Sequence, residues 1–288
     1  MGARFSSSGD RNGDGVPARI LDGKSLAAEL RADLAARATA LRERGIHPKL
    51  VIVFVGEDES SRAYVQALSR TGTQVGVDVV VDQLPAEATA AEIRARLNEL
   101  RTDPAVHGVM IQQPLPPHLS MREIAAAIPP EKDVDGANPA GGAVPATPAA
   151  VMLLLERSPH WPLRGRRAVV VGRSNVVGKP VAMLMLAADA SVTILHSKSG
   201  DLRPYLKDAD VVVAASGVPG LIRGGDLKPG ATVVDVGTTV VGGSLQGDVD
   251  FESALEIAGA ITPVPGGVGP VTNVALLRNV VAAAERRE

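Results

Sequence analysis

A short turn that carries two glycines, an arginine and a serine gives the first chemical signal in the sequence. The apolar run 168–171 is followed by Gly172, Arg173 and Ser174. A second glycine, Gly178, comes six residues after the first. This order is typical of a strand, a tight turn and a helix whose first amides attract phosphate, and glycine lets the backbone approach an anion closely. The spacing is not the common G-x-G-x-x-G, so an ordinary strand-to-helix turn without a ligand stays open as the alternative.

The residues after the next strand indicate which dinucleotide would bind. Ser197 and Lys198 come soon after the apolar segment 191–195, and no carboxylate stands beside them. An NAD site usually has an acidic residue there for the ribose 2′-hydroxyl, whereas a 2′-phosphate needs cationic and hydroxyl donors. Arg173, Ser197 and Lys198 could supply those donors, and a guanidinium suits phosphate well. The sequence therefore predicts NADP as the cofactor, and solvated surface residues are the alternative reading.

Composition argues against several other classes of protein. The 288 residues carry a formal net charge of −2 and no basic run mixed with aromatics, so nothing favours a nucleic-acid partner. The absence of cysteine excludes disulfides and thiolate metal sites, and the five histidines stand apart without ligand spacing. The apolar segments are shorter than the roughly 18 residues of a membrane span, and the N-terminus lacks the apolar core of a signal peptide. We therefore expect no metal, no membrane contact and a cytoplasmic protein.

Apolar periodicity predicts alternating strands and helices along most of the chain, which indicates an α/β fold with buried parallel sheets. The predicted strands are 49–55, 77–81, 108–111, 168–171, 191–195, 211–214, 232–235 and 260–261. The predicted helices are about 22–44, 60–75, 89–100, 120–128, 149–157 and 272–284, the last capped by Thr272. The Pro- and Gly-rich segment 263–270 is predicted to form no regular element.

Composition shifts divide the chain into a tail and two domains. Residues 1–17 are rich in Gly, Ser and Asp without an apolar period and are predicted to be disordered. Glycines and prolines between 141 and 148 predict the domain boundary. The first domain is then 18–148, a substrate and catalytic domain. The second is 149–271, a Rossmann-like doubly wound domain with a ligand crevice at the carboxyl ends of its strands.

A series of motifs stands in a fixed order along the chain. They are Asp22-Gly-Lys, Tyr64-Val, Gln112-Gln-Pro-Leu-Pro, Lys132-Asp-Val-Asp-Gly, Gly172-Arg-Ser-Asn-Val-Val-Gly-Lys-Pro, His196-Ser, Asp235-Val-Gly, Gly247-Asp-Val and Thr262-Pro-Val-Pro-Gly-Gly-Val-Gly-Pro-Val-Thr. Together they resemble the bifunctional methylenetetrahydrofolate dehydrogenase/methenyltetrahydrofolate cyclohydrolase family over nearly the whole chain. The resemblance implies a cleft between the two domains, a last helix, 272–286, that returns to the first domain, and a homodimer.

The resemblance also assigns roles on the substrate side. Asp135 looks like the carboxylate that holds the pterin ring of a folate, and Tyr64 looks like the aromatic platform and hydroxyl beside it. Gln112 resembles the amide that hydrogen-bonds within the catalytic group. A turn-forming Asp-Gly is the alternative for Asp135, and a core tyrosine is the alternative for Tyr64.

The cofactor side is implied in the same way. The residues expected to contact NADP are Gly172, Arg173, Ser174, Gly178, Ser197 and Thr238. The junction between nicotinamide and substrate would be lined by Pro265, Gly266 and Gly267.

The chain departs from the family pattern mainly on the substrate side. The pattern reads Tyr-Val-x-x-Lys, but Leu68 occupies the position of the lysine, one helical turn after Tyr64, where the side chain would point into the cleft. Arg70 lies roughly 200° around the helix from residue 68 and is no obvious substitute. Gln113 stands for a leucine and Ala146 for a cysteine, and the Gly-rich stretch before Ala146 looks shortened.

These departures lead to a specific functional hypothesis. Passing a hydride from the folate one-carbon bridge to NADP depends mostly on positioning, so a dehydrogenase can survive the loss of a proton carrier. Hydrolysis of methenyltetrahydrofolate to 10-formyltetrahydrofolate needs acid–base help that is typically worth about 10²–10⁴-fold. We therefore expect an oxidoreductase of one-carbon metabolism with an impaired hydrolase activity. Two alternatives stay open: an NADP-dependent paralogue that acts on another substrate in specialised metabolism, and a non-catalytic NADP-binding paralogue.

Overall fold

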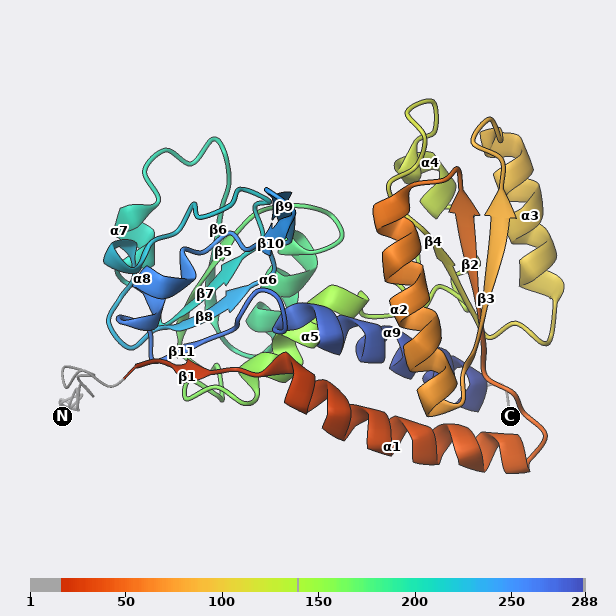
Figure 1. Cartoon of the computed structure of the whole chain (residues 1–288), viewed down its shortest axis with the longest axis horizontal. Helices are drawn as coiled ribbons and strands as arrows, with labels where there is room; N and C mark the ends of the chain where they lie inside the picture. Colours follow the sequence, from red (N-terminus) through yellow and green to blue (C-terminus); the bar gives the residue numbers. More distant parts are fainter. Residues whose placement is uncertain (1–16, 139, 287–288) are drawn as a thin grey trace, which may run out of the picture. The chain divides into compact units, whose positions relative to one another are not determined.

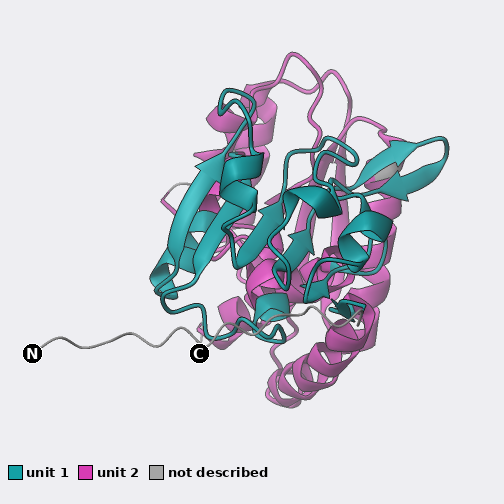
Figure 2. Ribbon diagram, turned by 90° about the vertical axis from the view of Figure 1, so that its left-hand side faces the viewer, with its two compact units in different colours: residues 1–22, 153–173, 182–267 teal, residues 23–152, 174–181, 268–288 magenta. Residues whose placement is uncertain are grey.

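The computed structural model describes residues 17–138 and 140–286 (Figure 1), so the predicted tail lies outside the described residues except for Pro17. The chain divides into two compact units, each assembled from separate segments (Figure 2). Unit 1 consists of residues up to 22, 153–173 and 182–267, and unit 2 of residues 23–152, 174–181 and those from 268 on. The units are defined by contacts between residues and do not test the predicted domain limits. The limits 18–148 and 149–271 therefore stay predictions.

Unit 1 is built around a six-stranded, all-parallel sheet in the order β1-β11-β8-β7-β5-β6. Its strands are β1 (Arg19–Ile20), β5 (Arg167–Val171), β6 (Ser191–Leu195), β7 (Val211–Ala214), β8 (Thr232–Asp235) and β11 (Ala260–Ile261). If the strands of this sheet from β5 on are numbered 1 to 5 along the chain, their order in the sheet is 2-1-3-4-5. This order confirms the doubly wound class. The order reverses between β5 and β7, and such a switch point is where open parallel sheets bind ligands.

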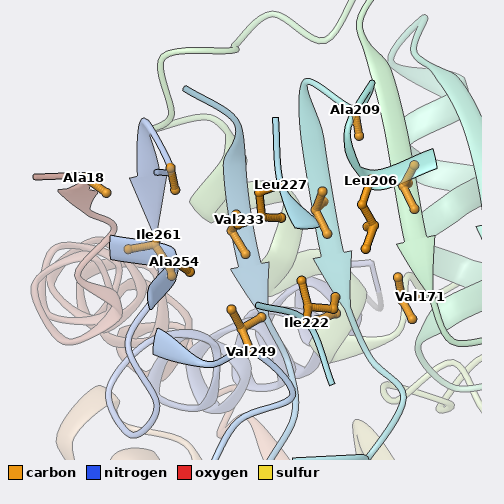
Figure 3. Close-up of a cluster of buried hydrophobic side chains, with 14 of the residues drawn as sticks. Ala18, Val171, Leu206, Ala209, Ile222, Leu227, Val233, Val249, Ala254 and Ile261 are labelled. Atoms are coloured by element: carbon orange, nitrogen blue, oxygen red, sulfur yellow. The ribbon is translucent and has the colours of Figure 1, made fainter. Parts of the chain in front are cut away.

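Short helices cover one face of this sheet. They are α7 (Arg203–Leu206), the 3₁₀ turn η1 (Gly224–Asp226) and α8 (Phe251–Leu255). Leu206, Leu227 and Ala254 pack there with strand residues such as Val171 and Val233 in one buried cluster (Figure 3). Every residue of β7 and β8 is buried, as expected for a parallel sheet covered on both faces. Helix α5 (Ala146–Leu155) and helix α6 (Gly178–Ala187) each have residues in both units.

Unit 2 contains a three-stranded parallel sheet in the order β3-β2-β4. Its strands are β2 (Lys49–Val55), β3 (Asp78–Leu84) and β4 (Gly108–Ile111). Helices α3 (Ala90–Thr102) and α4 (Met121–Ala125) follow in the chain order, and Ile93, Leu97 and Ile124 from this region pack on Val51, Val53 and Val55. The alternate residues of β2 face the opposite side, where α9 (Val268–Glu285) contacts both β2 and β4.

Helix α1 (Gly23–Glu43) runs beside α9 and contacts it along much of its length. Near their far ends, Arg37 donates to both carboxylate oxygens of Glu285, at 3.0 and 2.7 Å. A forked pair of this kind fixes the register of two helices better than a single contact does. The helix predicted at 272–286 is therefore part of unit 2.

The start of α9 corrects the sequence analysis, because the helix begins at Val268 and not at Thr272. Gly269 and Pro270 occupy its first turn, where a missing amide costs little. Thr272 lies inside the helix, and its hydroxyl donates to the carbonyl of Val268 at 3.2 Å. The prediction that 263–270 forms no regular element is therefore wrong for its last three residues.

Three short strands were not predicted. Strand β1 pairs with β11 over only two residues, too few to give a periodic signal. Strands β9 (Thr239–Val241) and β10 (Ser244–Gln246) form an antiparallel hairpin whose turn consists of Gly242 and Gly243, both with positive φ. Gly-Gly between two short strands is a known hairpin signal, and it was present in the sequence.

Helix α2 (Glu59–Val75) carries Tyr64, one of the predicted substrate residues, and its ends are well defined. The Asp58 carboxylate accepts from the amide of Ser61 at 2.7 Å, and Gly76 ends the helix in the left-handed conformation with φ 77°. A Cβ on Gly72 would lie 2.5 Å from a methyl of Val79, so this glycine lets α2 approach β3 closely. Among the described residues, no helix is long and apolar enough to cross a membrane.

Candidate functional site

One face of α2 carries Tyr64, which the sequence places at the substrate, together with Leu68, Thr71 and Val75. Leu68 and Val75 are fully buried, Thr71 is nearly so, and Tyr64 keeps part of its surface exposed. Burial raises the pKa of Tyr64, and the nearby carboxylate of Asp135 raises it further. The two predicted residues therefore lie near enough within unit 2 to interact electrostatically, and the Tyr64 hydroxyl stays protonated at neutral pH.

The loop that carries Asp135 is anchored by a buried lysine. Lys132 is 1% exposed, and its ammonium group donates to the carbonyls of Leu100 at 2.5 Å and Asp103 at 2.6 Å, at the end of α3. A cation at a helix C-terminus is favourable because the last carbonyls lack partners. Lys132 was not singled out for any role in the sequence analysis, although it belongs to one of the quoted motifs.

Asp133 holds the same loop together by hydrogen bonds to backbone amides within it. Its carboxylate accepts from the amides of Asn138 at 2.7 Å and Ala137 at 3.2 Å. Burial, together with the charge of Asp133, raises the pKa of Asp135 to about 7. Gly136 has a φ of 64°, so the turn proposed as the alternative reading is present as well. The turn and a binding role are compatible, since the turn is what presents the Asp135 carboxyl group.

Gln112 stands directly after β4 and is 7% exposed. Its amide NH₂ donates to the carbonyl of Gln113 at 2.6 Å, while its Oε1 is buried with no hydrogen-bond partner. The same Gln113 carbonyl accepts from the hydroxyl of Ser61 at 3.0 Å, which ties the first turn of α2 to the end of β4. A buried acceptor without a donor is costly, so Oε1 indicates a place for a ligand N–H or O–H. Ser61 was missed by the sequence analysis.

Leu68 is 0% exposed and belongs to unit 2. That its side chain points into the cleft stays a prediction. Arg70 is exposed, in agreement with its predicted place on another face of α2. No ionisable side chain therefore occupies the position one helical turn after Tyr64.

Gly172 lies at the switch point of the unit 1 sheet, with its amide bonded to the carbonyl of Leu195 at 2.8 Å. Its φ is 132°, and a Cβ there would lie 2.0 Å from the carbonyl oxygen of Ala215. The glycine is therefore required by the close approach of the segment after β7. This packing reason stands beside the predicted close approach of an anion, which stays a prediction.

The turn after Gly172 leads into α6, as predicted. The Ser174 hydroxyl oxygen accepts from the amides of Val177 at 3.1 Å and Gly178 at 3.3 Å, so it caps the start of the helix. Arg173 is exposed. A contact of Ser174 and Gly178 with the cofactor stays a prediction, since their printed bonds serve the helix start.

The loop after β6 fits a 2′-phosphate. The His196 amide donates to the Ser199 hydroxyl at 2.9 Å, and the Lys198 amide donates to His196 Nδ1 at 3.1 Å, which leaves the side chains of Ser197 and Lys198 exposed. The first carboxylate beyond the loop, Asp201, is bonded to the guanidinium of Arg203. Residues 196–200 thus contain no acidic side chain, and the carboxylate that follows them is already paired.

The remaining predicted cofactor and junction residues belong to unit 1. Thr238 and Pro265 are exposed, whereas Gly266 and Gly267 are buried. A Cβ on Gly267 would lie 2.6 Å from the carbonyl of Pro263, so its glycine also has a packing reason. Within the described part of the chain, no group of three or more His, Cys, Asp or Glu side chains could hold a metal ion.

Comparison with known proteins decides the family. Residues 21–135 match the catalytic domain, and residues 145–288 the NAD(P)-binding domain, of tetrahydrofolate dehydrogenase/cyclohydrolase. This chain belongs to that family. A relative from Bordetella petrii, the bifunctional protein FolD, is 49% identical over 279 residues, which cover 93% of this chain and 95% of the relative.

Solved structures of the family agree with the fold. The bifunctional FolD enzyme of Campylobacter jejuni superposes with a TM-score of 0.92 at 38% identity, covering 94% of this chain and 100% of that one. The FolD of Trypanosoma brucei, solved as a complex with NADP cofactor and inhibitor, gives a TM-score of 0.89 at 36% identity and covers 94% and 99%. The matches to these solved structures thus extend over 94% of this chain.

Proposed function

We propose that this protein catalyses the NADP-dependent oxidation of 5,10-methylenetetrahydrofolate to 5,10-methenyltetrahydrofolate. Membership of the family supports this activity, and one observation of the site carries it. Tyr64 and Asp135, both half-buried, belong to unit 2, and so does Gln112. The side-chain oxygen of Gln112 is buried and receives no hydrogen bond. An unpaired buried oxygen is costly in a protein that binds nothing, and it suits a substrate with an N–H donor.

The chain's own residues would hold the folate by hydrogen bonds. The Asp135 carboxylate accepts the N–H groups of the pterin, and deprotonation is accessible because its pKa lies at about 7. Tyr64 supplies an aromatic face and a hydroxyl donor that stays protonated. Gln112 accepts a further donor at Oε1. These contacts orient the one-carbon bridge for hydride loss, which needs placement more than proton transfer.

The cofactor residues fit NADP. Arg173, Ser197 and Lys198 are exposed, and Asp201, the first carboxylate after β6, is already paired with Arg203. When bound, NADP supplies the nicotinamide C4 that accepts the hydride. The residues of this chain bind the 2′-phosphate by charge-assisted hydrogen bonds, and the protein therefore prefers NADP to NAD.

The second activity of the family is proposed to be weak here. Hydrolysis of the methenyl group requires a group that takes a proton from water and returns one to nitrogen. Leu68 cannot do so, and the pKa of Tyr64 is raised away from neutrality. Asp135 titrates near pH 7 but is occupied by the pterin. The protein is therefore proposed to be a dehydrogenase with little cyclohydrolase activity.

A spectroscopic assay tests the dehydrogenase. The protein is mixed with methylenetetrahydrofolate and NADP, and absorbances of the reduced nicotinamide and of methenyltetrahydrofolate are followed together. We expect both products to form in equal amounts, faster with NADP than with NAD. Binding of NADP without turnover of the folate would overturn the proposal and leave the two paralogue alternatives.

We also propose that the protein is a homodimer through the edge of the unit 2 sheet. Strand β3 is an edge strand of seven residues, and Val80 and Val81 are 44% and 41% exposed. An open apolar edge favours association. Light scattering after size exclusion should give twice the chain mass, and Val80→Lys should shift the protein toward the monomer. A natural protein that is monomeric at micromolar concentration would contradict this.

The cytoplasmic location stays a prediction that cell fractionation can check.

A further inference from the structure

Two carboxylates in unit 1 are almost completely removed from solvent, and the functions described so far use neither of them. Asp235 ends β8 and is 4% exposed, and Asp248, just before α8, is 0% exposed. Both belong to motifs in the sequence, Asp235-Val-Gly and Gly247-Asp-Val, that had no assigned role. Neither forms a salt bridge with the described residues. Burial raises the pKa of Asp235 to about 6, and the charge of Asp248 adds to this.

Asp248 holds the segment that follows β7. Its Oδ2 accepts from the amide of Ser216 at 2.5 Å, from the hydroxyl of Ser216 at 2.9 Å and from the amide of Gly217 at 2.9 Å. Three donors on one oxygen are a strong and directional arrangement. Ser216 and Gly217 follow Ala215, whose carbonyl approaches the Cα of Gly172 so closely that only glycine fits. Asp248 thus fixes the backbone at the switch point of the sheet.

Asp235 fixes Asp248 in turn. Its Oδ1 accepts from the amides of Gly237 at 2.9 Å and Asp248 at 3.0 Å, and its Oδ2 accepts from the amide of Val249 at 2.9 Å. The Asp235 amide donates to the hydroxyl of Thr262 at 2.8 Å. The two aspartates therefore connect the segments after β7, β8 and β11, all at the carboxyl edge of the sheet: the carboxylates bond the first two, and the Asp235 amide bonds the third.

The glycines of the two motifs are required by this arrangement. A Cβ on Gly237 would lie 2.2 Å from Oδ1 of Asp248, and a Cβ on Gly247 would lie 2.0 Å from Oδ2 of Asp235. Oδ1 of Asp248 is buried without a hydrogen-bond partner. A fold does not keep two buried carboxylates and one unpaired oxygen without cost, since apolar residues would stabilise the same space better.

We propose that Asp248, itself held by Asp235, is a positioning residue that sets the Ser216–Gly217 backbone for the bound dinucleotide. The proposal rests on the NADP site proposed above. Ligands of doubly wound sheets lie at the switch point, so a displacement of this segment moves the cofactor. Because hydride transfer depends on close alignment, a small displacement affects both cofactor binding and turnover. Asp248 does this without touching the ligand.

The test compares two variants of Asp248 with a matched control. Asp248→Ala removes all three accepted bonds, whereas Asp248→Asn keeps one oxygen that can still accept from Ser216 and Gly217. The control, Asp250→Ala, removes the cap of α8 in the same segment, where Asp250 accepts from Ser253 at 3.4 Å, and leaves the Ser216 turn intact. The measurements are Kd and KM for NADP, KM for the folate, the melting temperature, and hydrogen exchange of the peptide that contains residues 216–217.

We expect Asp248→Ala to raise the Kd and KM for NADP by about tenfold or more, with faster exchange at 216–217 and an unchanged folate KM. Asp248→Asn should recover most of the affinity, and Asp250→Ala should lower only the melting temperature. Unchanged NADP binding in a folded Asp248→Ala variant overturns the proposal. If Asp248→Ala does not fold, a partial loss of NADP affinity in Asp248→Asn with faster exchange at 216–217 supports it, and unchanged affinity with unchanged exchange overturns it. A natural protein that binds no NADP would instead overturn the proposed function.

Discussion

Leu68→Lys is the substitution that separates the two activities of the family. It restores an amine one helical turn after Tyr64, at a position where the natural side chain is fully buried. If the missing proton carrier is the reason for weak cyclohydrolase activity, the variant should gain that activity. The same burial makes the substitution costly for the fold, and both effects can be measured on one protein.

The magnitude follows from the burial of residue 68. A fully buried lysine has its pKa lowered by about 3–5 units, and each unit corresponds to about 1.4 kcal/mol. This gives an upper bound of about 4–7 kcal/mol, which the long apolar stem reduces if it carries the amine toward the half-exposed Tyr64. We expect a loss of about 3–5 kcal/mol at pH 6. Because the unfolded chain binds the extra proton, the stability of the variant should rise with pH up to about 10.

The assay is the decay of methenyltetrahydrofolate above its spontaneous rate, paired with thermal melting between pH 6 and 9. The natural protein should stay close to background, and Leu68→Lys should exceed it by about tenfold or more as the amine becomes neutral. Leu68→Met serves as the control, since a swap of similar volume costs less than about 1.5 kcal/mol and adds no base. Fast hydrolysis by the natural protein would refute the reasoning and show that another group carries the proton.

Three further predictions concern single residues. Asp135→Asn should abolish folate binding. As the pH rises from about 4 to 7, the natural protein should lose stability relative to this variant, because a carboxyl group with a raised pKa stabilises the fold only while it is protonated. A constant difference between the two melting temperatures at all pH values would contradict this. Arg173→Ala should weaken NADP binding by about tenfold to hundredfold and leave NAD binding unchanged, by titration calorimetry; equal losses for both would show that Arg173 does not meet the 2′-phosphate. Gly172→Ala should lower the melting temperature strongly, since its Cβ would collide with Ala215, whereas Gly225→Ala, with nothing within 4 Å, should not; similar melting temperatures would count against the close packing.

Elements with a clear apolar pattern could be predicted from the sequence, and several strand limits agree with the structure. Strands β2 and β4 were predicted as 49–55 and 108–111, because buried parallel strands are continuous apolar runs that end at Gly or polar residues. Strand β1 could not be predicted, since two residues carry no period and its partner, β11, is more than 200 residues away. The start of α9 was missed because glycine and proline were taken as breakers, although the first helical turn accepts both.

The candidate site could be predicted only in part, and mostly by resemblance. Residue types at Tyr64, Gln112 and Asp135 indicated a polar site, but the raised pKa of Asp135 arises from burial and from Asp133, which spacing does not reveal. The unpaired oxygen of Gln112 depends on how Gln113 and Ser61 are placed in space. Carboxylates such as Asp248 look like ordinary surface residues in a sequence, and only the folded chain shows their burial.

The way in which the chain alternates between the two units has a consequence for its synthesis. Unit 1 takes β1 from before α1 and its other strands from after residue 166, while unit 2 takes its last helix, α9, from residues 268–285. A ribosome that has delivered the first half of the chain has therefore completed neither core. The face of β2 and β4 that α9 covers, with Leu276, Leu277 and Val280 fully buried, stays open until α9 emerges. Folding on the ribosome thus cannot finish one domain at a time, and a chain shortened by its last helix would keep every strand yet leave unit 2 with an exposed apolar face.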